Sequence, residues 1–226
     1  MKLLSVGNPK LMKGEKKGYL SFVLHLSPAD VSGYETCPKR TAGCTAACLN
    51  TAGRGGMFKP GGTNTIQEAR KRKTRMFFEQ RDEFLAALEA DIRKGIKQAE
   101  KKGMIPAFRL NGTSDIAWEK YGIIQKFPEV QFYDYTKMRN RKVSGLTNYH
   151  LTFSKADGND MDVRLAASAG MNVAVVFDKL PATYIGREVI DGDDTDLRFL
   201  DKKGVVVGLK AKGRARKDTS GFVVKV

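Results

Sequence analysis

Short strand-like runs of hydrophobic residues alternate with amphipathic stretches along most of the chain. They predict strands at residues 19–26, 105–110, 130–135, 149–154 and 173–177. The first and last of these are continuously apolar, which is typical of strands buried on both faces, whereas polar and apolar side chains alternate in 130–135 and 149–154. Behind them, shorter runs between Gly-Asp and Lys-Gly turns predict three further strands at residues 184–190, 205–210 and 222–226.

A helical spacing of apolar residues covers the stretch from residue 65 to residue 102. Thr65 and Glu68 have the spacing of a capping box at its start, and Gly103 follows its end. Between them the pattern predicts one long helix or two in series, with a single buried stripe formed by Phe77, Phe84, Leu88, Ile92, Ile96 and Ala99. Shorter amphipathic stretches predict helices at residues 116–127 and 160–169.

Strands and helices that alternate with short connections indicate an α/β fold with a parallel sheet. Two architectures fit this order, a doubly wound sheet and a barrel of the eightfold type. We expect an incomplete TIM-like parallel barrel with a few extra short strands at the C-terminus. The 226 residues, 41% of them hydrophobic, suffice for one core, so we expect a single domain over residues 1–226.

The chain is strongly basic, with a formal net charge of +15. Such a balance favours anionic partners, nucleic acid among them, although it also serves solubility. The basic runs at residues 70–73 and 210–217 are candidate phosphate contacts or solvated surface. No apolar stretch is long enough for a membrane span or a signal peptide, so we expect a cytoplasmic protein without a membrane partner.

All three cysteines lie in the loop that follows the first predicted strand. Cys37, Cys44 and Cys48 have the spacing C-x6-C-x3-C among small residues. Three thiolates can hold an iron–sulfur cluster of the 4Fe-4S type and leave one iron open. A structural zinc ion needs a fourth ligand, for which the chain offers only His25 and His150. Buried free thiols are the remaining alternative.

Polar residues follow several of the predicted strands, where a parallel sheet collects its functional groups. We predict cofactor or ligand contacts from Asn111, Ser114, Tyr135 and Ser154, and acid, base or electrostatic roles for Lys137, His150 and Asp115. Structural roles compete with these, because an Asn-Gly pair forms turns and Ser or Asp caps helices. A strand histidine is also commonly held by hydrogen bonds alone.

Several long strings resemble a family of phage proteins, the gene product 88 type. They read CPKRTAGCTAACLNTAGRG, RLNGTSDIAWE, FPEVQFYDYTK and NYHLTFS, and the similarity is strongest over residues 21–154. The layout is also similar to radical S-adenosylmethionine enzymes, which carry a three-cysteine loop after the first strand of a partial barrel. This resemblance implies a 4Fe-4S cluster and makes S-adenosylmethionine a candidate cofactor, while the usual spacing there, C-x3-C-x2-C, differs from the one here.

Together these patterns predict a phage-encoded iron–sulfur protein in the host cytoplasm. Its open iron would face a polar pocket and meet a small-molecule or anionic ligand, with redox or radical-type chemistry if the protein is an enzyme. The alternative is a basic accessory protein that binds nucleic acid and uses its metal only for structure. The sequence leaves open which of the two classes applies.

Overall fold

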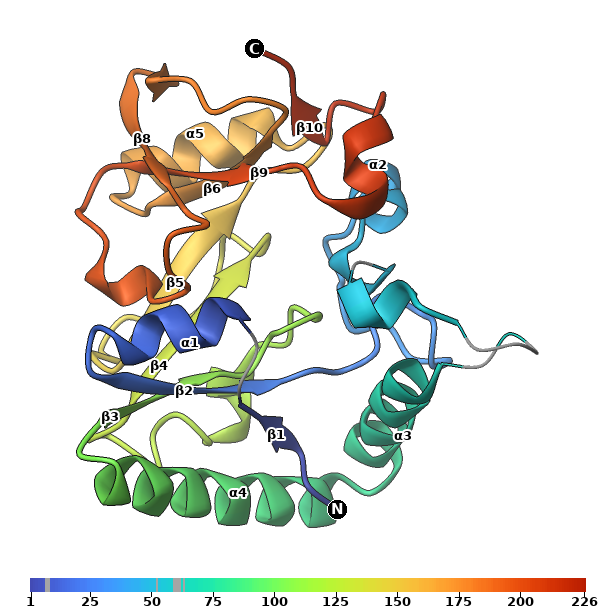
Figure 1. Cartoon of the computed structure of the whole chain (residues 1–226), viewed down its shortest axis with the longest axis vertical. Coiled ribbons are helices and arrows are strands. Elements are labelled where there is room, and N and C mark those ends of the chain that lie inside the picture. The colour runs from blue at the N-terminus through green and yellow to red at the C-terminus, as the bar shows by residue number, and fades with distance from the viewer. Residues whose placement is uncertain (7–8, 52, 59–61, 63) are drawn as a thin grey trace.

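A single sheet runs through the computed structural model, which describes residues 1–6, 9–51, 53–58, 62 and 64–226 (Figure 1). Within these residues the sheet has ten strands. In chain order they are β1 Leu4–Ser5, β2 Tyr19–Leu24, β3 Ile105–Arg109, β4 Gln131–Thr136, β5 Tyr149–Ser154, β6 Val173–Phe177, β7 Thr183–Tyr184, β8 Arg187–Asp191, β9 Val206–Lys210 and β10 Val223–Val224.

The spatial order is β1-β2-β3-β4-β5-β6-β9-β8-β7, and every pair from β2 to β8 is parallel. β1 and β7 add antiparallel edges at the two ends. β5 pairs with the first residues of β6, and β10 pairs with the last residues of β6 on the same edge, so β10 continues the sheet where β5 ends. The predicted α/β class and parallel order are confirmed, whereas the sheet is open and a TIM-like partial barrel is not confirmed.

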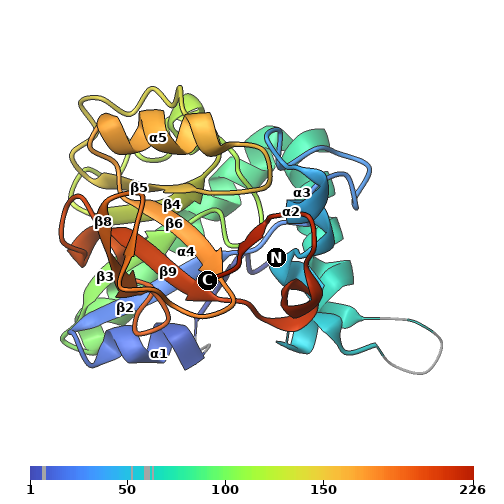
Figure 2. The same cartoon turned by 90° about the horizontal axis from the view of Figure 1, so that it is seen from above.

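The regular helices are α1 Pro9–Glu15, α2 Ala42–Ala46, α3 Thr65–Glu79, α4 Arg81–Lys101 and α5 Asp160–Ser168. Short 3-10 turns are η1 Leu49–Thr51, η2 Gly53–Gly56, η3 Trp118–Tyr121, η4 Arg198–Leu200 and η5 Gly213–Lys217. Figure 2 shows α2 beside the C-terminal segment around η5, although some 170 residues separate them in the chain, and η1 contacts η5.

The predicted long helix is two helices in series, α3 and α4, which meet at Gln80. Asn64, not Thr65, caps α3, because its Oδ1 accepts hydrogen bonds from the backbone of Ile66 and Gln67. The predicted stripe faces the sheet and is buried except for Ile96, which is half-buried. At Gly95 the missing side chain lets α4 approach the rings of β2 and β3 closely.

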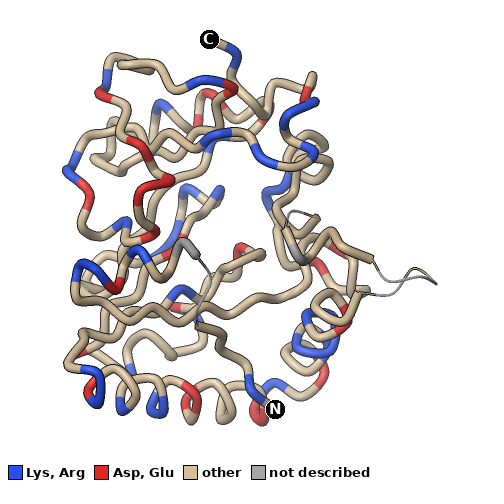
Figure 3. Tube along the Cα trace, in the orientation of Figure 1, with Lys and Arg blue, Asp and Glu red and all other residues tan. Residues whose placement is uncertain are grey.

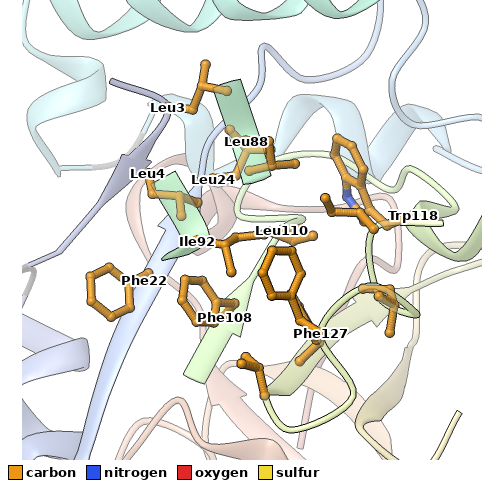
Figure 4. Close-up of a cluster of buried hydrophobic side chains, with 14 of the residues drawn as sticks. Leu3, Leu4, Phe22, Leu24, Leu88, Ile92, Phe108, Leu110, Trp118 and Phe127 are labelled. Carbon is orange, nitrogen blue, oxygen red and sulfur yellow. The ribbon is translucent and has the colours of Figure 1, made fainter. Parts of the chain in front are cut away.

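Side-chain alternation gives the sheet two chemically different faces. Phe22 and Phe108 point toward α4 in the larger core cluster, to which Leu151 also belongs and of which Figure 4 shows the centre. Phe153 continues the same face into a second cluster beneath α5. Because neighbouring residues on a strand point to opposite sides, the ends of β3, β4 and β5 present polar groups on the other face.

Two predicted elements differ from the structure. Residues 116–127 form the η3 turn and irregular chain instead of a helix, since Gly122 has a positive φ, while Ile123, Ile124 and Phe127 are still buried in the core. Residues 184–190 belong to the hairpin of β7 and β8, because Ile185 and Gly186 both have positive φ. β1 and α1, near the N-terminus, had no counterpart in the sequence pattern.

Among the described residues, no helix is both long and apolar enough to cross a membrane.

Candidate functional site

A cavity of about 400 Å³ lies on the polar face of the sheet, at the carboxyl ends of the parallel strands. One wall is the cysteine loop, and the floor is made by the ends of β3, β4, β5, β6 and β9. The segment around η5 closes the remaining side. The volume is within the range of small-molecule sites.

Cys37, Cys44 and Cys48 all line this cavity and are all half-buried. The Sγ of Cys37 accepts a hydrogen bond from the backbone N–H of Ala29 at 3.5 Å. Burial raises the pKa of Cys37 and of Cys48. In the part of the chain that the structure describes, no three Cys, His, Asp or Glu side chains converge on a point where they would hold a single metal ion.

A carboxylate from a distant loop holds the cysteine helix α2 in place. Asp157, just after β5, accepts hydrogen bonds from the backbone N–H groups of Gly43 at 3.0 Å and Cys44 at 3.1 Å. The hydroxyl of Thr41, the N-cap of α2, also donates to it. A Cβ at position 43 would lie 2.6 Å from the Asp157 carboxylate, so this close approach requires glycine. The bond between Asp157 and Gly43, which are 114 positions apart in the chain, thereby helps to fix Cys44 against the sheet.

Asp157→Ala should loosen this attachment. The lost N-terminal cap costs about 1–2 kcal/mol locally, so Cys44 should react several-fold faster with a thiol reagent in the native protein. The measurement is the rate of thiol labelling under non-denaturing conditions, with the labelled site found by peptide mapping. Asp160→Ala is the matched control, since Asp160 is the first residue of the following helix α5 and its side chain is 65% exposed. Equal labelling rates in the two variants would show that Asp157 does not position the helix.

Positive side chains lie next to the thiols. Lys137 follows β4, and its ammonium group lies close to Cys44. Burial lowers the pKa of Lys137, but its interactions with Cys44, Asp115 and Cys37 outweigh this, so the pKa is raised and the group stays charged. Burial raises the pKa of Cys48, and Arg70 of α3 opposes this because its positive charge favours the thiolate. Both cations would compensate negative charge on the thiol side of the cavity.

The loop after β3 is organised by Asn111, which is only 2% exposed. Its Oδ1 accepts from the backbone of Ile116 at 2.8 Å, from Ser114 at 2.9 Å and from the Trp118 ring nitrogen at 3.1 Å. Asn111 therefore has a structural function besides lining the cavity, and Ser114 is tied to it. No helix begins here, so the expected cap by Ser114 or Asp115 is wrong.

Asn111 is in turn held by the buried carboxylate of Asp134. Asp134 accepts from the Asn111 backbone at 2.7 Å and from the Tyr149 hydroxyl at 2.9 Å. Burial raises the pKa of Asp134 to about 7 despite these donors, which favour the charged form. This network makes the floor of the cavity rigid at the end of β4.

Asp115 connects the same loop to the one that carries Lys137. Its Oδ2 accepts the backbone N–H of Lys137 at 2.8 Å, and its Oδ1 lies 3.5 Å from Arg141. Burial raises the pKa of Asp115. Of the predicted residues outside the cysteines, Asn111, Ser114, Asp115, Tyr135, Lys137 and Ser154 all line the cavity.

A family model described as Gene product 88 matches residues 2–226. The chain belongs to the Gene product 88 family. No curated protein and no solved structure matches it. The family assignment therefore extends over nearly the whole chain, the cysteine loop and all the cavity walls included.

The two histidines of this Gene product 88 family member do not line the cavity. His150 lies on β5, where burial and then Arg198 lower its pKa to about 4. His25 follows β2, and burial together with Arg70 and Arg109 lowers its pKa to about 3. Both imidazoles are therefore neutral at pH 7, and neither stands beside Cys44 as a fourth ligand.

Several side chains in the two basic runs of this family member form hydrogen bonds or ion pairs within the molecule. Lys73 donates to the backbone of Leu3 at 2.6 Å, and Arg70 bonds Asn50. In the second run, Lys210 pairs with Asp191 at the end of β8, and Lys212 pairs with Asp193 in the turn that follows. Figure 3 shows basic and acidic positions interspersed along most of the trace. Nucleic-acid binding thus stays a prediction from net charge.

Sequence reasoning gave no role at the cavity to Asp157 or Asp196. Asp196 lines it and Asp157 holds helix α2 of its wall, both from loops far from the cysteines in the chain, and nothing in their local sequence indicates these contacts. Arg109 has a weak signal, because it is the last residue of β3 and alternation turns it away from Phe108, which lies in the core.

Proposed function

We propose that the protein binds a 4Fe-4S cluster through Cys37, Cys44 and Cys48 and presents its open iron to the cavity. The observation that carries the proposal is the position of the thiols. Every cysteine of the chain lies on one wall of a single cavity at the carboxyl ends of a parallel sheet. Three thiolates are the ligand set of a cubane cluster with one open site.

The charges around the thiols fit such a group. Lys137 and Arg70 stand beside Cys44 and Cys48, where they would offset the negative charge of three thiolates and sulfide. The backbone of Asn50 donates to Cys48, as that of Ala29 does to Cys37. Hydrogen bonds to sulfur of this kind tune clusters in proteins.

The ligands that the described residues offer also favour a cluster over one zinc ion. The ligands of one ion must meet at a single point, whereas each thiolate of a cubane binds a different iron. The described residues offer no three ligands at such a point, although the three cysteines share a cavity wall. Neither histidine lines that cavity to complete a tetrahedral site.

When bound, the cluster supplies an electron carrier and a Lewis-acidic iron with an open position. The protein's own groups would hold the ligand there and supply protons. Lys137 keeps a proton on Nζ, and Asp115 has a raised pKa at the same wall. The proposal has two further parts. The sheet is an incomplete TIM-like barrel, and S-adenosylmethionine is a candidate ligand of the open iron.

Anaerobic reconstitution with ferrous iron and sulfide tests the proposal on the full chain. The desalted protein should be brown, absorb broadly in the visible range and contain about four iron and four sulfide per chain. A colourless protein with one zinc per chain, or iron without sulfide, would contradict the cluster. Electron paramagnetic resonance of the dithionite-reduced sample then identifies the cluster type.

A further inference from the structure

A second cavity, of about 300 Å³, adjoins the loop that carries Lys137. Its walls come from the cysteine loop, the η3 turn, the loop after β4 and the first turn of α5. Lys137 lines both this second cavity and the cysteine-lined one. The proposed cluster gives the second cavity no role, so its charges need an explanation of their own.

The two carboxylates of the second cavity are already paired with arginines that line it too. Glu119 accepts hydrogen bonds from two nitrogens of Arg141, each at 2.6 Å. Asp162 accepts one from the Nε of Arg139 at 3.2 Å. The charges of these two pairs therefore cancel, and the pairs tie the loop after β4 to η3 and to α5.

Three lysines remain as an excess of positive charge. Lys39 and Lys120 are exposed, and their ammonium groups have no hydrogen bond or ion pair with another residue that the structure describes. Lys137 carries the third charge, beside Cys44 and Asp115. A single exposed lysine needs no partner, but cations that converge on one hollow from three segments focus a positive potential there, which attracts an anion.

This excess selects the charge of the ligand. A carboxylate carries one negative charge and would leave most of the excess uncompensated, whereas a phosphate ester carries about −1.5 to −2 at pH 7. Lysines commonly bind phosphate as point charges, and the guanidinium of Arg139 adds a planar donor. The apolar lining among the described residues consists of Ala117 and Met138, so the anionic group would supply most of the binding.

The shape of the second cavity favours a small ligand over a nucleic-acid strand. Proteins follow a phosphate backbone with a continuous positively charged groove and stack its bases on aromatic rings. The described residues that line the second cavity include no aromatic side chain. Its volume lies at the lower end of the range for small-molecule sites.

We propose that the second cavity binds a small phosphorylated molecule, whose phosphate is held by Lys39, Lys120 and Arg139. Because Lys137 lines both cavities, the bound anion would also stabilise the positive charge of this lysine beside Cys44. The inference goes beyond the proposed function and does not depend on the cluster, since the site consists of the chain's own side chains.

Inorganic pyrophosphate is the probe, measured by calorimetry and phosphorus NMR on the metal-free full-length protein. A single equivalent should bind, about tenfold more tightly than acetate, because its several charges match the excess of lysines. Several weak equivalents per chain, or an affinity no higher than that of acetate, would overturn the inference. So would a short oligothymidylate that displaces pyrophosphate and binds more tightly, since the surface would then be a nucleic-acid contact.

Lys39→Gln combined with Lys120→Gln should weaken pyrophosphate binding about tenfold, while folding persists because both side chains are exposed. The matched control is Lys97→Gln with Lys101→Gln, two exposed lysines of α4 that line neither cavity. It lowers the net charge equally and should bind pyrophosphate like the unchanged protein. Equal losses in the two double variants would mean general attraction to a basic protein and no site. Iron and sulfide analysis of reconstituted samples tests the cluster separately, so either idea can fail alone.

Discussion

Replacing Cys44 with serine is expected to abolish the iron and sulfide content of the reconstituted protein. The same result is expected for Cys37→Ser and Cys48→Ser, because three thiolates are the minimum that holds three irons of a cubane in this chain. Serine has nearly the size of cysteine but is a poor ligand for iron, so the fold should persist. Iron should fall from about four per chain to below one after anaerobic reconstitution and desalting.

Ala46→Ser is the matched control for these variants. Ala46 lies on the same helix α2 but is exposed and does not line the cavity. It receives the same hydroxymethyl side chain and should retain the full iron and sulfide content. Circular dichroism and thermal unfolding should be alike in all four variants. If any cysteine variant kept its iron and sulfide, that cysteine would not be a ligand and the three-thiolate site would be wrong.

The central strands could be predicted from sequence because their patterns have clear ends. β5 and β6 have the predicted bounds, residues 149–154 and 173–177. Both lie in the middle of the sheet, where β6 is apolar at every position and β5 alternates apolar core residues with polar ones on the other face. β1, with two residues, is too short to produce such a pattern.

The segment 116–127 shows where periodicity misleads. Its apolar residues have helical spacing, yet they are buried in irregular chain that Asn111 fixes at one end and Gly122 turns at positive φ. A buried irregular segment also needs apolar residues, so the pattern alone does not separate the two structures. The deciding hydrogen bonds come from the end of β3, which local sequence analysis does not include.

The residues of the candidate site could be predicted from sequence wherever the order of strands alone determines which side chains come together. The rule that parallel strands bring their carboxyl ends together placed Asn111, Tyr135, Lys137 and Ser154 around the cysteine loop, and they do line one cavity. His150 points to the same face but is not at the cavity, because it lies four residues before the end of β5. Strand alternation predicts on which face of the sheet a side chain lies, but only its position along the strand decides whether it reaches the cavity at the carboxyl end.

Arg141→Ala is expected to destabilise the protein by about 3–5 kcal/mol, with a fall in melting temperature of roughly 10 °C. Both nitrogens of the guanidinium edge pair with Glu119 at 2.6 Å, and the side chains of both residues are only 4% exposed. Arg141 also donates to Tyr149 at 3.0 Å. Removing it leaves the carboxylate of Glu119 buried without its cation, which is the costly form of a broken buried pair.

Arg139→Ala provides the comparison, since the Arg139 and Asp162 side chains are 43% and 48% exposed and their pair should contribute less than about 0.5 kcal/mol. Urea unfolding at pH 7 measures the free energy of unfolding of both variants. If both lost the same amount of stability, burial would not be what makes the Arg141 ion pair contribute more than the exposed one. Arg141→Met with Glu119→Leu removes both charges and should recover part of the stability.

Because Asp115 bonds the backbone of Lys137, Arg141→Ala should also loosen the loop that carries Lys137 to Cys44. The buried pair therefore stabilises the fold and the thiol side of the cavity through the same contacts.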